Sequence, residues 1–192
     1  MPNDRVFSDR LDTLEKKLNQ IIEILTADQQ PEEPDPTTML ESELIEVPGM
    51  QAPWVLQFPK WEGKSEIYDE EELKDFLGFN PNDDDPDGKA WCAGFLKRIF
   101  EECGIDTTGL DLSAMSFANF GYECEPVNGA ILVFQPKIDA KHRISHVGVK
   151  VNDDKLFGGN QGDSAKESNL AWYMQHAELV ACRCPNGYKL VA

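Results

Sequence analysis

The sequence is poor in basic residues and has neither a long apolar run nor a recognisable secretion leader. Its 192 residues include 18 Lys and Arg against 35 Asp and Glu, which gives a formal net charge of −17. This charge argues against a nucleic-acid clamp, which needs a basic face, and against docking on anionic lipid. Because no run of about 18 apolar residues is present, we expect no membrane span.

The start of the chain and its cysteines bear on the compartment. The first ten residues, MPNDRVFSDR, lack the basic and then apolar stretches of a signal peptide, so we expect synthesis in a cytoplasm without a leader. The 5 cysteines are odd in number and unevenly spaced. In a reducing cytoplasm, free thiols are expected rather than a disulfide framework.

The negative charge is concentrated in the front of the chain. Residues 1–87 carry 7 Lys and Arg and 23 Asp and Glu, a net charge of −16, whereas residues 88–192 carry 11 and 12, a net charge of −1. The nearly neutral part also holds all 3 histidines and all 5 cysteines. We therefore expect the chemistry in the second part, which has no charge that excludes an anionic polymer.

Residues 1–28 are predicted to form a helix with a coiled-coil seam. Apolar side chains recur at spacings of 4, 3, 4, 3 and 4 residues: Phe7, Leu11, Leu14, Leu18, Ile21 and Leu25. A lone helix with so narrow a stripe is marginal in water, so we expect residues 7–25 to self-associate or to dock on another protein. The alternative is packing on the chain's own second half. Residues 29–38 are rich in Pro and acid and are expected to be a linker.

Residues 39–192 are predicted to be one α+β domain. Residues 53–61 are rich in aromatics and are expected to pack in an extended form, and residues 66–79 show helical spacing with a solvated acidic face. Strands are predicted at residues 129–136 and 145–151. A turn and a further strand follow in KLFGGNQG.

Cys92 carries the sharpest chemical signal. Asp87 or Gly88 can start a helix that Gly104 ends, and apolar spacing puts one face of that helix in the core. The first turn of a helix has unpaired N–H groups and a partial positive charge, which favour a nucleophilic thiolate. The alternative is that Cys92 is simply a small core residue.

His146 and Asn160 are candidates for the base and for the residue that orients it. His146 opens one predicted strand, and Asn160 follows a Gly-Gly pair at the end of the next strand. Side chains on paired strands can lie side by side, which is the geometry a base and its orienting group need beside a thiolate. The alternative for a single histidine in a strand is a structural role.

These motifs resemble those of the NlpC/P60 and CHAP cysteine peptidoglycan hydrolases. WCAGF, NGAILVF, SHVGVKV and FGGNQ occur here in the family's order, and they look most like the phage-encoded branch, whose members carry WCAAF, GHVG and GGNQ. The resemblance covers residues 88–184 well and residues 39–87 loosely, and it does not cover the N-terminal helix. Two positions depart from the family's pattern: Ser145 replaces a Gly, and residues 128–130 replace a GD pair.

The resemblance implies a papain-like α+β fold in which a helix bearing the cysteine packs on an antiparallel sheet. It implies Cys92 as nucleophile, His146 as general base and Asn160 as orienting residue, with Gln161 as the alternative to Asn160. The implied activity is that of a peptidase or amidase on bacterial peptidoglycan, without an organic cofactor. The implied setting is the bacterial cell wall, where the protein would act as an endolysin or a virion-attached lysin made in the host cytoplasm.

An acidic loop before Cys92 suggests a calcium site. Asp83, Asp85 and Asp87 alternate and are followed by Gly88, so three carboxylates can converge on one hard cation. Some CHAP endolysins look similar here, although the EF-hand pattern fails because Gly94 stands where it needs Glu. The alternative is a solvated acidic turn.

Two further alternatives concern the cysteines near the end of the chain and the function as a whole. Cys182 and Cys184 alternate in a predicted strand, and we expect them to pack in the core rather than bind zinc, because two ligands are too few. For the function, the competing hypothesis is a non-enzymatic virion component, in a tail or capsid, with a vestigial hydrolase domain. An acyltransferase on the same scaffold is a third hypothesis.

Overall fold

The computed structural model describes residues 44–82, 89–138 and 144–191, which all lie in one unit, Leu40–Ala192. The predicted helix at 1–28, the linker at 29–38 and the aspartates at 83, 85 and 87 lie outside the described residues. Among the described helices, none is long and apolar enough to cross a membrane.

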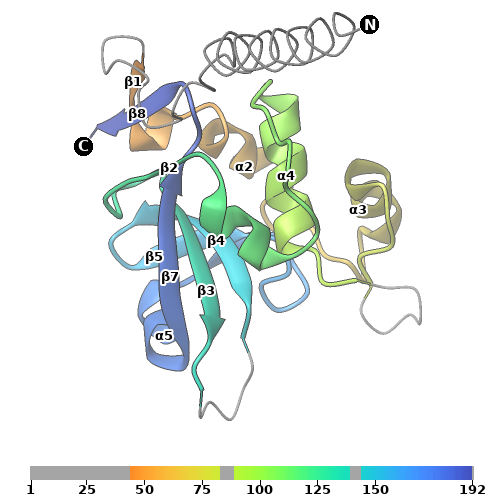
Figure 1. The fold of residues 1–192 in the computed structure, drawn as a ribbon. Helices are drawn as coiled ribbons and strands as arrows, with labels where there is room; N and C mark the ends of the chain where they lie inside the picture. The colour runs from red at the N-terminus through yellow and green to blue at the C-terminus, as the bar shows by residue number, and fades with distance from the viewer. Residues whose placement is uncertain (1–43, 83–88, 139–143, 192) are drawn as a thin grey trace, which may run out of the picture. The chain divides into compact units, whose positions relative to one another are not determined.

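An antiparallel sheet forms the centre of the described part (Figure 1). Its six strands, in spatial order, are β2 (Tyr122–Glu123), β7 (Ala177–Cys184), β3 (Ile131–Pro136), β4 (His146–Asn152), β5 (Lys155–Gly158) and β6 (Lys166–Asn169). A separate parallel pair joins β1 (Ile45–Pro48) to β8 (Tyr188–Val191). The strands predicted around His146 and before Asn160 are confirmed as β4 and β5, which pair in an antiparallel hairpin.

Helices cover both faces of the sheet, so the α+β class is confirmed. The longer ones are α3 (Glu70–Leu77), α4 (Cys92–Glu102) and α5 (Leu170–His176). The shorter helical turns are η2 (Gly49–Gln51), η3 (Val55–Gln57), α2 (Phe58–Trp61) and η4 (Ala114–Asn119). In Figure 1, α4 lies next to the sheet with α3 beyond it, and α5 lies beside β7.

The prediction of an extended segment at residues 53–61 was wrong. Residues 55–61 are helical, in η3 and α2, because Trp54, Phe58 and Trp61 bury their side chains at helical spacing against the core. Pro59 occupies the first turn of α2, where its missing N–H breaks no helical hydrogen bond.

Side-chain alternation in the strands creates two cores. Val133, Val147 and Val149 face the larger core, which includes the buried side of α4. Leu132, Phe134 and Leu156 face a smaller core, which α5 covers with Tyr173. Because successive side chains in a strand point to opposite faces, His146, which is paired with Phe134, belongs to the α5 side.

The helix that carries Cys92 starts later than predicted. Trp91 is its N-cap with a non-helical φ of −117°, so Cys92 is the first helical residue, and Asp87 and Gly88 do not begin α4. The helix ends as predicted, since Cys103 is its C-cap and Gly104 follows with a φ of 70°. The prediction that Cys92 lies in the first turn of a helix is therefore confirmed. The helix starts about one turn later than the sequence predicted.

Candidate active site

Cys92 lies at the buried start of α4. Its residue is 6% exposed, and the helix continues with the buried side chains Ala93, Phe95 and Leu96. The side chain of Trp91, the N-cap residue, makes no capping hydrogen bond to the helix. The first turn of a helix has N–H groups without intrahelical partners and a partial positive charge, which favour a developing negative charge near Cys92.

A buried carboxylate fixes the residue before Cys92. The indole Nε1 of the fully buried Trp91 donates a hydrogen bond to Glu66 Oε2, and Glu66 itself is 3% exposed. The sequence had suggested a solvated acidic face for the segment that begins at Glu66, and at this residue the interpretation was wrong. Sequence reasoning missed Glu66 because its partner lies 25 residues away.

The backbone around Glu66 is joined to the loop that follows β5. The N–H of Glu66 donates to Asp163 O at 3.1 Å, and Ser65 forms a β-bridge with Ser164. Ala165 N–H donates to Lys64 O at 2.9 Å. Residues 63–66 thus tie the start of α4, through Trp91, to the loop that contains Asn160 and Gln161.

His146 opens β4 and is buried, with 5% of its surface exposed. Its ring stacks on Tyr173, with centroids 4.9 Å apart and an interplanar angle of 15°. Burial lowers the pKa of His146 to about 4, so the imidazole is neutral at neutral pH. Its Nε2 is buried and has no hydrogen-bond partner among the described residues.

Tyr173, which stacks on His146, is itself buried. Burial raises the pKa of Tyr173 to about 12, and the negative charge of a Cys92 thiolate adds to this rise, while a hydrogen bond with Ser168 opposes it. No local signal in the sequence distinguishes Tyr173 from other buried aromatics.

Gly158 ends β5 and Gly159 follows it, and the two residues face opposite sides of the sheet. A Cβ atom on Gly159 would lie 2.6 Å from the Trp91 ring and 2.7 Å from Phe95 Cβ. A Cβ atom on Gly158 would lie 3.4 Å from His146 Nε2. Only glycine fits this close approach, which brings the start of α4 and the histidine to the same end of the sheet.

Asn160 and Gln161 follow these glycines and occupy different environments. Asn160 lies two residues beyond the end of β5 with a left-handed φ of 52°, so the β4–β5 pairing does not reach it. Gln161 is 2% exposed, its Nε2 lies 3.5 Å from Leu156 O, and its buried Oε1 has no partner among the described residues. Both remain candidates for orienting the histidine.

The structure also bears on the predicted metal ligands and on the cysteines other than Cys92. Within the described residues, no group of three or more His, Cys, Asp or Glu is placed to hold a metal ion, and the predicted calcium ligands lie outside them. All five cysteines are described and none forms a disulfide. Cys184 is fully buried, and the half-buried Cys182 has its Sγ 3.7 Å from that of Cys124, in keeping with the expected packing role.

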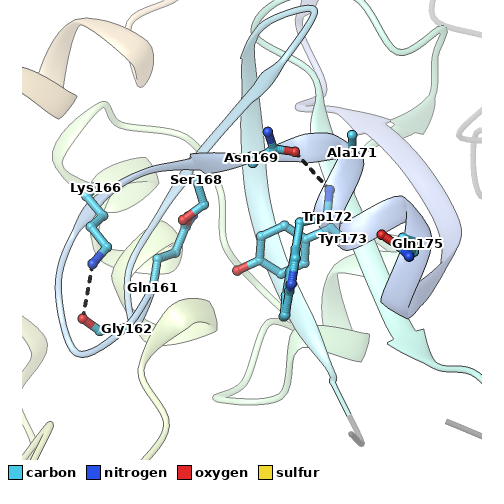
Figure 2. Close-up of a pocket in the computed structure, with 9 residues that line it drawn as sticks. All are labelled: Gln161, Gly162, Lys166, Ser168, Asn169, Ala171, Trp172, Tyr173 and Gln175. Atoms are coloured by element: carbon cyan, nitrogen blue, oxygen red, sulfur yellow. Dashed lines mark hydrogen bonds between the residues drawn. The ribbon is translucent and has the colours of Figure 1, made fainter. Parts of the chain in front are cut away.

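A pocket of about 680 Å³ opens beside the histidine (Figure 2). Its lining includes Gln161 and Tyr173, which both lie next to His146, and continues to Lys166 and Trp172. Figure 2 shows the Tyr173 hydroxyl pointing toward Gln161 and Ser168. Cys92 and His146 do not line the pocket themselves, and Gln161 and Tyr173 are the lining residues that adjoin the histidine.

Comparison with known proteins finds similarity only among solved structures, since no family profile and no curated protein matches the sequence. NlpC1 and NlpC2 from Trichomonas vaginalis are each 18% identical to this chain, with TM-scores of 0.40. The match to NlpC1 covers 64% of this chain and 45% of NlpC1, and the match to NlpC2 covers 66% of this chain and 48% of NlpC2. An NLP/P60-family protein from Staphylococcus aureus, similar to a lipoprotein, is 15% identical with a TM-score of 0.42, over 73% of this chain and 41% of its own. The chain thus spans less than half the length of each, and its family remains a prediction from the motifs.

Proposed function

We propose that this chain is a cysteine peptidase or amidase of the NlpC/P60 type that hydrolyses amide bonds in bacterial peptidoglycan. The observation that carries the proposal is the convergence at one end of the sheet. Cys92 begins a buried helix, and the adjacent Gly159 and Gly158 bring Trp91, the residue before Cys92, and the buried His146 close to the same turn. The motifs around these residues supply the substrate class.

In the proposed reaction, His146 takes the thiol proton of Cys92 and the thiolate attacks the amide carbonyl carbon. Backbone N–H groups of the first turn of α4 stabilise the oxyanion. His146 then gives the proton to the leaving amine as the C–N bond breaks, which leaves a thioester on Cys92. Water activated by His146 hydrolyses the thioester, releasing the acid and restoring the thiol.

The proposed third residue fixes the histidine's tautomer. An oxygen that accepts from Nε2–H leaves Nδ1 as the base that faces the thiol. Gln161 supports this role because its buried Oε1 and His146 Nε2 both lack partners among the described residues and lie around Gly158. Rotation of the Gln161 amide would put Oε1 where Nε2 now lies, on the Gly158 side. Asn160 is the alternative, supported by its place just after β5, the strand that pairs with the one His146 opens.

Release of amines from purified peptidoglycan, with mass spectrometry of the fragments, tests the proposal. Wild-type protein should release new amino groups, and Cys92→Ala should reduce the release to background. Cys103→Ala is the matched control, because it removes a half-buried thiol from the opposite end of the same helix and should leave activity unchanged. Amine release that survives Cys92→Ala would refute the mechanism.

The proposal includes a phage-type setting, in which the protein acts on the cell wall while attached to a virion or assembly through residues 7–25. The support is the seam at those residues and the likeness of the motifs to the phage-encoded branch. Binding of the full chain to isolated virion proteins should then require these residues. A chain lacking residues 1–38 that binds them equally well would contradict the attachment.

The proposal also includes calcium binding by Asp83, Asp85 and Asp87, supported by their alternation before Gly88. Calcium should raise the melting temperature of the full chain more than magnesium does. Replacing all three aspartates by Asn should remove that difference. An equal melting temperature in calcium and in chelator would contradict the site.

A further inference from the structure

The pocket next to His146 carries one positive charge, that of Lys166. It is lined by neutral polar groups, two aromatic rings and one charged side chain, Lys166. Asp163 and Glu167 are close to Lys166 in sequence but do not line the pocket. Among the described residues, no carboxylate forms an ion pair with Lys166.

Lys166 has hydrogen-bonding capacity left for a ligand. Its Nζ donates to the backbone oxygen of Gly162 at 3.3 Å, drawn as a dashed line in Figure 2. An ammonium group has three donors, and a neutral carbonyl satisfies one without neutralising the charge. A negatively charged group in the pocket would therefore gain an attraction that no described side chain now supplies.

The other walls suit an extended, polar chain molecule. Trp172 is 45% exposed and is held between two rings: it meets Tyr173 edge-on at 5.1 Å and stacks on His176 at 4.6 Å. Asn169 Oδ1 accepts from Trp172 N–H at 2.9 Å, which fixes the start of α5. A volume of about 680 Å³ is within the range of pockets that take ligands of several hundred daltons.

We infer that this pocket binds the part of the substrate beside the cleaved amide, and that Lys166 pairs there with a free carboxylate. The inference rests on the proposed function and narrows its substrate class. It implies preference for stem peptides that carry a carboxylate next to the scissile bond over the same peptides in carboxamide form. Lys166 is then a specificity-determining residue.

A matched pair of synthetic stem peptides, one with the carboxylate and one with the carboxamide, tests the inference. Wild type should cleave the carboxylate peptide with a kcat/KM about three- to five-fold higher, as expected for an ion pair in a partly exposed pocket, with the difference mainly in KM. Lys166→Met should abolish the preference by weakening only the carboxylate peptide. Lys189→Met, which changes the net charge equally on the distant β8, should retain it.

Binding to the Cys92→Ala protein separates this inference from the proposed function. Calorimetry with that variant measures the preference without turnover, and it should again favour the carboxylate peptide and lose this preference with Lys166→Met. Equal binding of the two peptides, or no binding of either, would overturn the inference even if hydrolysis is observed. Preferential binding in a protein whose wild type cleaves neither peptide would overturn the proposed function and leave the pocket's specificity standing.

Discussion

At the scale of single residues, His146 is unusual because it is a buried histidine. A histidine that is 5% exposed and whose Nε2 has no described partner loses solvation that a surface histidine keeps. Burial is the cause of its low pKa, since a charged imidazole is disfavoured away from water. Proton transfer starts from a neutral imidazole, but a pKa of about 4 makes a weak base, so the transfer depends on the Cys92 thiolate stabilising the imidazolium that forms.

The first prediction is a dependence of stability on pH. The folded pKa of His146, about 4, lies below an unfolded value of about 6.5, so the unfolded state binds more protons between these values. Stability should therefore be lost as pH falls from about 6.5 to 4, with His146 contributing on the order of 3 kcal/mol. Urea unfolding across this range measures it.

His146→Phe is the control for this prediction, because it keeps a ring against Tyr173 and removes the titration. The slope of the unfolding free energy between pH 4 and 6.5 should become flatter in the variant. Parallel pH profiles for wild type and His146→Phe would assign the acid sensitivity to other groups.

The second prediction distinguishes the two candidates for the third residue. Gln161→Met removes the buried oxygen and keeps the side-chain volume, and it should lower kcat at least roughly tenfold, or about 1.4 kcal/mol, with KM little changed. Asn160→Gly accepts the left-handed φ of 52° and should cost less. A larger loss in kcat for Asn160→Gly would assign the role to Asn160 instead.

At the scale of elements, the start of α4 depends on contacts that are remote in sequence. Trp91 caps the helix without a side-chain hydrogen bond to it and is held by Glu66 on one side and Gly159 on the other. The position of Cys92 is therefore set by three segments at once. Changes in any of them should disturb the nucleophile as well as the fold.

The third prediction concerns the Trp91–Glu66 hydrogen bond. Trp91→Phe removes the donor to a buried carboxylate and should cost about 1–3 kcal/mol beyond the lost ring area. Trp61→Phe is a matched control, because Trp61 is also buried and its indole N–H has no partner among the described residues. Chemical denaturation compares the two, and equal losses would contradict the role of Glu66.

The fourth prediction concerns the close approach at Gly159. Gly159→Ala places a methyl group 2.6 Å from the Trp91 ring and should destabilise the protein by roughly 1–3 kcal/mol, with a further loss of activity as Trp91 moves. Gly94→Ala in α4 should cost less, because its methyl meets the far end of the Phe79 ring and alanine favours a helix. Equal stability of Gly159→Ala and wild type would show that the Trp91 ring can move away from the added methyl group without cost.

The elements around the site were largely predictable and the remote contacts were not. The alternation in β4 and the first-turn position of Cys92 are local patterns, so sequence spacing identified them. The helical form of residues 55–61, the burial of Glu66 and the position of Tyr173 depend on packing between distant segments. The motifs predict Cys92 and His146 as site residues, but no spacing indicated that Tyr173 would stack on the histidine.

At the scale of the whole molecule, charge and chemistry are separated along the chain. A net charge of −16 belongs to residues 1–87 and −1 to the rest, which carries Cys92, His146 and the pocket with its single lysine. The folded unit itself, Leu40–Ala192, carries 14 Lys and Arg and 26 Asp and Glu, a net charge of −12, so the near-neutrality is confined to residues 88–192. Residues 44–82 of the acidic front part belong to the folded unit with Cys92, and the segment proposed for attachment is limited to residues 1–38.

The fifth prediction is that residues 1–38 serve assembly and are not needed for the chemistry. By size-exclusion chromatography with light scattering, the full chain should be larger than a monomer, and a chain lacking residues 1–38 should be a monomer. Cleavage of soluble stem peptides should be equal in the two. A full chain that is monomeric would contradict self-association and leave docking on another protein.

The central claim is that Cys92 forms a covalent acyl intermediate with a peptidoglycan fragment, and capture of that intermediate tests it most directly. A reaction stopped with acid after milliseconds to seconds should yield intact protein heavier by the mass of one acyl fragment, located by peptide mapping on Cys92. Cys92→Ala should carry no such adduct, and Cys103→Ala should carry it in full. An adduct on another residue, or amine release by wild type with no thioester at any time point, would contradict the account.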